Sequence, residues 1–221
     1  AVHQLMQSYI NCDTNKVRID NDAYKNYAAY STWFGKKFPV VFDVCVMSNV
    51  LSFVQAHHLD WTKADSASLS FILATINNKD YINHPLNISP YYGSTSIILY
   101  HLARLMSIEP IAALENIKPL LIATAVNEFQ STSNLLERII LCSAIMKWGY
   151  ISPEIKLPAQ NEIADAIERN DFAFFIGNIP SYLNDTQRKI LLSDHLGLFY
   201  HYCPAYNDAL LLEYLALKNA P

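Results

Sequence analysis

The chain has 221 residues, of which 52% are hydrophobic and 16% are charged, and its formal net charge is −4. Apolar side chains are therefore ample for a folded core, and the small charged fraction argues against disorder. The mild acidity gives no basic stripe of the kind that nucleic-acid binding needs, so we expect no nucleic-acid partner. No apolar run approaches the roughly 18 residues of a membrane span, and we expect none.

The four cysteines are Cys12, Cys45, Cys142 and Cys203, which lie far apart and form no C-x-x-C pair. In a chain of this length, that spacing is typical of reduced, buried thiols and not of a disulfide framework. The N-terminal stretch shows no basic segment followed by an apolar one, so we expect no secretory signal. These features together predict a cytoplasmic protein.

Apolar side chains recur at helical spacing in four segments, and each segment is predicted to be a mostly buried helix. These helices are expected at residues 43–57, 94–107, 134–148 and 207–217. Side chains that can cap a helix N-terminus stand at or near the start of each one, namely Asp43, Ser94, Ser133 and Asn207. Gly149 follows the third helix in the place of a C′ residue.

Amphipathic segments that are typical of surface helices lie between these four. They are "SASLSFILATINN", "IAALENIKPLLIATAVNEFQ", "NEIADAIERND" and "DTQRKILLSDHLG". Pro119 should break the second of them in two, because proline removes a helical hydrogen bond. Residues 150–160 contain two prolines and are predicted to be an internal loop. Since the chain has only 5 glycines for turns, the pattern predicts an all-α fold.

The order of these segments indicates a degenerate repeat of helix pairs, with one inner and one outer helix in each unit. Each of the four buried helices follows a loop that is rich in aromatic and small polar residues. No stretch of the sequence stands out as a domain boundary. We therefore predict a single domain over residues 1–221.

Three stretches, "YSTWFGKKFPVVFDVCVMSNVLSFV", "SPYYGSTSIILYHLARLMS" and "YNDALLLEYL", resemble the α/α toroid of squalene cyclases and protein prenyltransferase β subunits. The resemblance implies helical hairpins around a ring, with parallel inner helices and a central apolar cavity for an isoprenoid or lipid-like ligand. The acidic cluster and the Gln-Trp turns of the cyclases are missing here. Four clear inner helices are also fewer than a complete ring needs, so the expected toroid is partial or open.

The prenyltransferase resemblance also implies a zinc set, which would be Asp43, Cys45 and His101. Helix geometry argues against it, since His101 would lie several residues inside its helix while Cys45 lies close to a helix start. Ile98 also stands where the prenyltransferases have an aspartate. We therefore expect His101 to be a packed core histidine, and we expect no metal or cofactor. The zinc enzyme stays as the least favoured alternative.

Parallel inner helices would bring the loops before them to one end, where we predict the main pocket. Its expected lining is Tyr30, Trp33, Asp43, Tyr91, Tyr92, Tyr206 and Asn207. Helix N-termini and tyrosines suit a ligand with an apolar tail and a polar or anionic head. The alternative is a non-enzymatic helical scaffold that binds a protein or peptide. No G-x-S-x-G, H-E-x-x-H or phosphate loop occurs, so the sequence assigns no catalytic residue and leaves enzymatic activity open.

Overall fold

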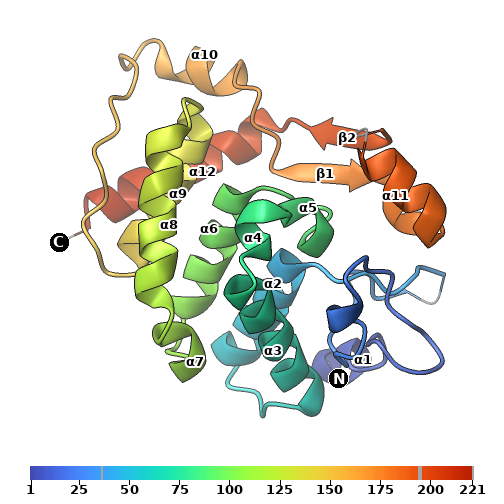
Figure 1. Ribbon diagram of the computed structural model, residues 1–221. Coiled ribbons are helices and arrows are strands. Elements are labelled where there is room, and N and C mark those ends of the chain that lie inside the picture. Colours follow the sequence, from blue (N-terminus) through green and yellow to red (C-terminus); the bar gives the residue numbers. More distant parts are fainter. Residues whose placement is uncertain (36, 194–195, 221) are drawn as a thin grey trace. The chain divides into compact units, whose positions relative to one another are not determined.

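The computed structural model describes residues 1–35, 37–193 and 196–220 (Figure 1). Its internal contacts divide the chain into two compact units. The first unit comprises Ala1–Ser94 and Ile176–Tyr200, and the second comprises Thr95–Phe175 and His201–Pro221. The single domain over residues 1–221 stays a prediction.

The first unit is built mainly of helices and long connecting loops. Its helical elements are α1 (Val2–Met6), η1 (Asp22–Tyr24), α2 (Val44–Ala56), α3 (Lys63–Asn77), α4 (Asp80–Asn83), α5 (Pro85–Ile88), η2 (Ile179–Tyr182) and α11 (Asp185–Ser193). Helix α2 packs against α3, and α3 against α4. A capping box fixes the start of α3. The Thr62 side chain accepts the backbone N–H of Asp65, and the Asp65 side chain accepts the backbone N–H of Thr62.

Aromatic rings fill the core of the first unit. The Phe71 ring, fully buried in α3, lies at its centre. Its centroid is 5.2 Å from that of Tyr24, 5.9 Å from that of Tyr27 and 4.9 Å from that of Phe42. Edge-to-face contacts of this kind add to the stabilisation that burial already gives. They join α3 to the segment that contains Tyr24 and Tyr27 and to Phe42, which directly precedes α2 and its cap.

The second unit is a helical cluster around one central helix. Its helices are α6 (Thr95–Met106), α7 (Ala112–Glu115), α8 (Lys118–Ser131), α9 (Leu135–Lys147), α10 (Ile163–Glu168) and α12 (Pro204–Lys218). Helix α9 packs against α6, α8 and α12. Helix α6 is buried along almost its whole length, as its nearly continuous apolar sequence predicts.

Most predicted helix limits are confirmed. The Asp43 side chain caps α2, and Pro119 stands in the first turn of α8, which is separate from α7. The cap of α9 is Asn134 and not Ser133. Helix α12 begins at Pro204, earlier than predicted, because the fixed φ of proline suits the first helical position. No helix in the described ranges is long and apolar enough to cross a membrane.

The predicted all-α toroid of repeated hairpins is wrong. Two short strands, β1 (Phe175–Asn178) and β2 (Leu198–His201), form a small sheet. The predicted inner helices also do not form one series, since α2 packs in the first unit, whereas α6, α9 and α12 pack in the second. After α9 the chain runs through an irregular segment, the predicted loop, before the short helix α10. Helical periodicity predicts each helix, but it does not determine which helices pack together.

The cysteines are all unpaired in the structure. Cys45 and Cys142 are buried, as expected for small apolar side chains. Cys12 and Cys203 are exposed, so the expectation of buried thiols is wrong for these two. Both exposed thiols lie in segments outside helices, where their neighbours are mostly polar or exposed.

Gly149 gives a direct test of the predicted end of α9. Its φ is +82°, and no atom lies within 4 Å of the place where a Cβ would stand. We expect Gly149→Ala to lower the free energy of unfolding by about 1 kcal/mol, because only the left-handed backbone is penalised. Urea unfolding measures this change. Gly149→Asn is the matched control and should cost less, since asparagine tolerates this conformation. Equal losses for the two variants would contradict the explanation.

Candidate functional site

The buried carboxylate of Asp43 joins the start of α2 to the segment that follows α5. One oxygen accepts the backbone N–H groups of Cys45 at 2.9 Å and Val46 at 3.2 Å, which caps the helix. The same oxygen accepts the Ser89 hydroxyl at 2.7 Å, and the second oxygen accepts the Tyr91 backbone N–H at 3.1 Å. The side chain therefore acts both as a cap and as a clamp between two segments.

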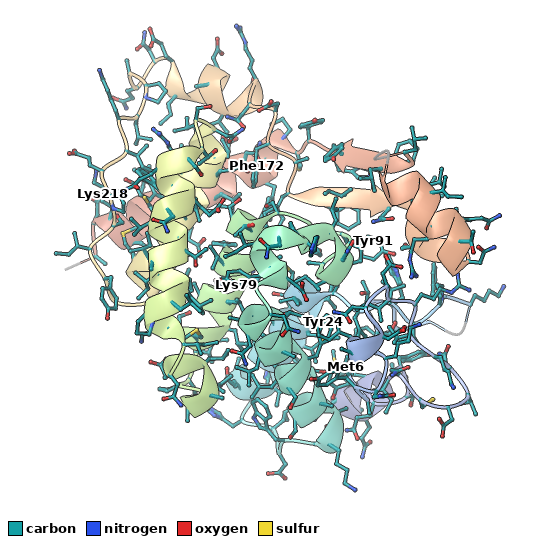
Figure 2. The ribbon with its side chains drawn as sticks, viewed as in Figure 1. Met6, Tyr24, Lys79, Tyr91, Phe172 and Lys218 are labelled. Atoms are coloured by element: carbon teal, nitrogen blue, oxygen red, sulfur yellow. The ribbon has the colours of Figure 1, made fainter. Side chains whose placement is uncertain are left out.

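A directed chain of hydrogen bonds begins at Trp33 and passes through Tyr91, which Figure 2 labels. The Trp33 indole N–H donates to the Tyr91 hydroxyl at 3.0 Å. The Tyr91 hydroxyl lies 2.6 Å from the Ser181 hydroxyl, which donates to the Asn178 carbonyl at 2.6 Å. Because the hydroxyl hydrogen of Ser181 is committed to that carbonyl, Tyr91 must donate to Ser181. Each bond in such a chain polarises the next.

The same segment is also held through its backbone. The Ile176 N–H donates to the Tyr91 carbonyl at 2.9 Å, and the Asn178 side-chain amide donates to the Pro90 carbonyl at 3.1 Å. The Asn178 side-chain oxygen in turn accepts the Ser181 N–H at 3.0 Å, which caps η2. Residues 89–91 are therefore bonded on one side to α2 and on the other to β1 and η2.

Four apolar side chains lie beside this network, and we call them the aromatic ridge: the half-buried Trp33 and the exposed Phe38, Ile179 and Tyr182. Trp33 stacks on Phe38 with centroids 5.3 Å apart, and Phe38 contacts Tyr182 at 6.1 Å. Ile179 and Tyr182 lie three residues apart in η2, so their side chains point the same way. Phe38 is 46% exposed and Ile179 is 49% exposed.

Two arginines lie beside the ridge. The Arg18 guanidinium donates to the Tyr182 and Leu183 carbonyls. The almost completely buried Arg188 forms an ion pair with Asp20 at 2.6 Å. Both arginines line a small cavity of about 20 Å³, together with Asn178 and Ser181. The cavity has room for roughly one water-sized group, and two guanidinium groups against one carboxylate leave it electropositive.

Burial dominates the electrostatics of this site. It raises the pKa of Asp43 to about 6, and the four hydrogen-bond donors oppose that rise. Burial, followed by the negative charge of Asp43, raises the pKa of the Cys45 thiol well above its ordinary value. The pKa of Tyr91 is also raised, mainly by burial. At neutral pH these groups are a carboxylate, a protonated thiol and a neutral phenol.

The structure brings three of the predicted pocket residues together, namely Trp33, Asp43 and Tyr91. Tyr30 belongs to a different cluster in the first unit, where its hydroxyl donates to Asp65 at 3.0 Å. His3 also pairs with that buried carboxylate, at 3.0 Å. Tyr30 is fully buried, so its side chain packs the core between α1 and α3.

The other predicted lining residues lie elsewhere. Tyr92 is half-buried next to Tyr91. Tyr206 and Asn207 lie inside the first turn of α12 and not in a loop before it. The Tyr206 ring packs on Phe174 at 4.6 Å, and Asn207 is buried without capping the helix. Pro204 begins the helix before either residue, which is why neither can serve as its cap.

The residues of the zinc alternative do not fit a metal site. Both oxygens of Asp43 already accept N–H or O–H donors, and the Cys45 thiol is held in its protonated form, whereas zinc binds thiolate. Within the described ranges no group of three or more His, Cys, Asp or Glu side chains could hold a metal ion. His101 is buried against Phe174, and burial lowers its pKa to about 3. It is the packed core histidine that we expected.

Sequence reasoning missed Arg18, Phe38, Asn178, Ser181 and Arg188. The sequence could have indicated Phe38, because "TWFGKKFP" places aromatic, glycine and lysine residues in one loop. The other four residues had no such signal, since Asn178, Ser181 and Arg188 lie far along the chain from Trp33, and Arg18 lies far along the chain from its partner Tyr182. Their roles follow from pairings such as Arg18 with the Tyr182 carbonyl, which are separated by 164 residues.

The two roles of Asp43, capping α2 and holding residues 89–91, can be distinguished by substitution. We expect Asp43→Ala to lower the free energy of unfolding by roughly 3 kcal/mol, because it removes a helix cap and leaves the Tyr91 N–H and Ser89 hydroxyl buried without an acceptor. Asn134→Ala removes a cap of the same geometry from α9, together with more exposed hydrogen bonds from its amide to Asn170 and Asp171, and should cost about 1 kcal/mol. Urea unfolding of both variants measures the difference. Equal losses would show that Asp43 is only a cap.

The raised pKa of Asp43 also predicts a pH dependence. The folded state holds this proton up to a pH of about 6, while the ordinary pKa of the carboxyl is 3.8, so folding takes up a proton between these values. Stability should therefore fall as pH rises through that window, by up to about 3 kcal/mol. Asp43→Asn removes the titrating group, and the difference in unfolding free energy between wild type and variant should shrink as pH rises from 4 to 6. A difference that stays constant or grows would exclude the raised pKa.

In comparisons with known proteins, no family model matches this chain, and no curated protein and no solved structure does so either.

Proposed function

We propose that the first unit binds a lipid-like amphiphile, an apolar chain with an anionic head, on the aromatic ridge. The observation that carries this proposal is the position of Arg18, whose guanidinium is hydrogen-bonded to the backbone of Tyr182 at the edge of the ridge. A cation is thereby held beside exposed aromatic and aliphatic side chains. This combination suits a ligand that is charged at one end and apolar along the rest.

The apolar part of the ligand would lie along Trp33, Phe38, Ile179 and Tyr182. The hydrogen bond from Trp33 to Tyr91 and the stacking on Phe38 hold the indole in one orientation. Ring positions that are already fixed lose little conformational freedom when a ligand binds, which favours binding. Exposed apolar side chains in contact with one another are also more informative than scattered ones, because scattered ones are normal on any surface.

The anionic head would lie at Arg18 and the mouth of the electropositive cavity. A cavity of about 20 Å³ accepts one oxygen-sized group, not a whole head group. A phosphate or carboxylate would therefore place one oxygen inward and stay open to solvent on its other side. Arg18 and Arg188 favour an anion there over a neutral head.

The experiment uses two probes with the same chain, octyl phosphate and octyl glucoside, each below its micellar concentration. Calorimetric titration should show binding of both, with tighter binding of the phosphate. Phe38→Ala should weaken both by about fivefold, since it removes part of the apolar contact. Arg18→Gln should weaken octyl phosphate by about tenfold and leave octyl glucoside nearly unchanged.

Trp61→Ala is the matched control, because Trp61 is 41% exposed in the same unit but is not part of the ridge. It should leave both affinities unchanged. No binding of octyl phosphate, or equal weakening by Trp61→Ala and Phe38→Ala, would refute the proposal. In that case binding of a protein or peptide, the alternative raised by the sequence, becomes the better explanation of the ridge.

The expected compartment is the cytoplasm. What supports it is that the four cysteines are unpaired, which suits a reducing environment. The proposed ligand is compatible with that compartment, since it needs neither a disulfide nor a metal to be held.

A further inference from the structure

The loop between Ile10 and Tyr30 closes on itself in the first unit. Ile10 and Tyr30 form an isolated antiparallel bridge, and the Asn11 N–H donates to the Ala29 carbonyl at 3.0 Å. The two ends of the loop are therefore side by side, while 19 residues run out and back between them. Compact surface loops with paired ends often carry function.

The Asn11 side chain holds this loop from the inside. Its amide N–H₂ donates to the Lys25 carbonyl at 2.7 Å and to the Tyr27 carbonyl at 2.9 Å, and its oxygen accepts the Val17 N–H at 2.8 Å. The side chain is buried, so these bonds are protected from water. One residue thus keeps the outgoing and returning parts of the loop at a set separation.

A groove of about 520 Å³ lies between those two parts of the loop. Its volume is within the range of about 300–1,000 Å³ that is typical of small-molecule sites. The apolar lining comes from Ile10, Val17 and Ala28, and the charged lining comes from Lys16, Lys25 and Asp13. Among the lining residues two ammonium groups stand against one carboxylate, and Asp22, which pairs with Lys25 from outside the lining, is strongly exposed.

We propose that this groove binds a small anionic molecule with a compact apolar part, such as an aryl phosphate or an aromatic carboxylate. The apolar part would lie on Ile10 and Val17, and the anion between Lys16 and Lys25. Lys25 also pairs with Asp22 at 2.6 Å, and Asp22 is strongly exposed, so an anion in the groove would compete with a solvent-screened partner. The site is separate from the aromatic ridge and does not depend on the function proposed for it.

Cys12 lines the groove and serves as a reporter. Its thiol is exposed and lies 3.3 Å from the Thr14 hydroxyl, whose hydrogen bond lowers the pKa of the thiol. Alkylation of Cys12 should therefore be readily measured. Cys203 is also exposed but belongs to the second unit, so it reports on the reagent alone.

The experiment follows alkylation of both cysteines by iodoacetamide at increasing phenyl phosphate concentrations, with peptide mass spectrometry as the readout. We expect saturable slowing at Cys12, by fivefold or more at saturation, and none at Cys203. Benzyl alcohol, which is neutral, should protect Cys12 much less. Lys16→Gln and Lys25→Gln should each raise the half-protecting concentration by about two- to fivefold.

Lys63→Gln removes an exposed lysine of the same unit outside the groove and should change nothing. Phe38→Ala should also leave the protection intact, which keeps this test independent of the ridge. Absent protection, equal slowing at Cys12 and Cys203, or protection that survives both groove substitutions would each overturn the proposal.

Discussion

The candidate site of the first unit depends on the need to satisfy the buried carboxylate of Asp43. A charge without contact to water is tolerated only when hydrogen-bond donors surround it, and Asp43 has four. Two of these donors come from the first turn of its own helix, where backbone N–H groups have no carbonyl partner within the helix. The other two come from Ser89 and Tyr91, far along the chain. The cost of the charge is therefore offset only when α2 and residues 89–91 are together.

That constraint passes outward to the surface. Once its backbone is clamped, the Tyr91 hydroxyl can accept from Trp33 and donate to Ser181, and this places the Trp33 ring against Phe38. The position of the Trp33 ring in the ridge is thus fixed by buried hydrogen bonds and not by apolar packing alone. The groove around Asn11 uses the same strategy on a smaller scale, since one buried polar side chain sets the spacing of a loop. Both proposed sites are surfaces supported by satisfied polar groups.

The incorrect toroid shows where pattern reasoning fails. Helical spacing in "DVCVMSNVLSFV" and "NLLERIILCSAIMKWG" correctly predicts α2 and α9. It also predicts the N-cap of α2 at Asp43 and the end of α9 before Gly149. Similar helices preceded by similar loops nevertheless do not have to pack as equivalent units of a ring. The strands β1 and β2 have four residues each, too few for a period of two to stand out.

The sequence by itself determined the long helices α2, α6 and α9, the break at Pro119, the cap at Asp43 and the burial of His101, because each follows from local spacing or from the chemistry of one residue. It also drew attention to Trp33, Asp43 and Tyr91 as members of one site. Only the tertiary structure decided that Ser181 and Asn178 complete the network and that Arg18 lies at the edge of the ridge. These partners are separated from the others by 88 residues or more along the chain. Hydrogen bonds over such separations depend on how the whole unit packs, and local sequence patterns carry no information about that packing.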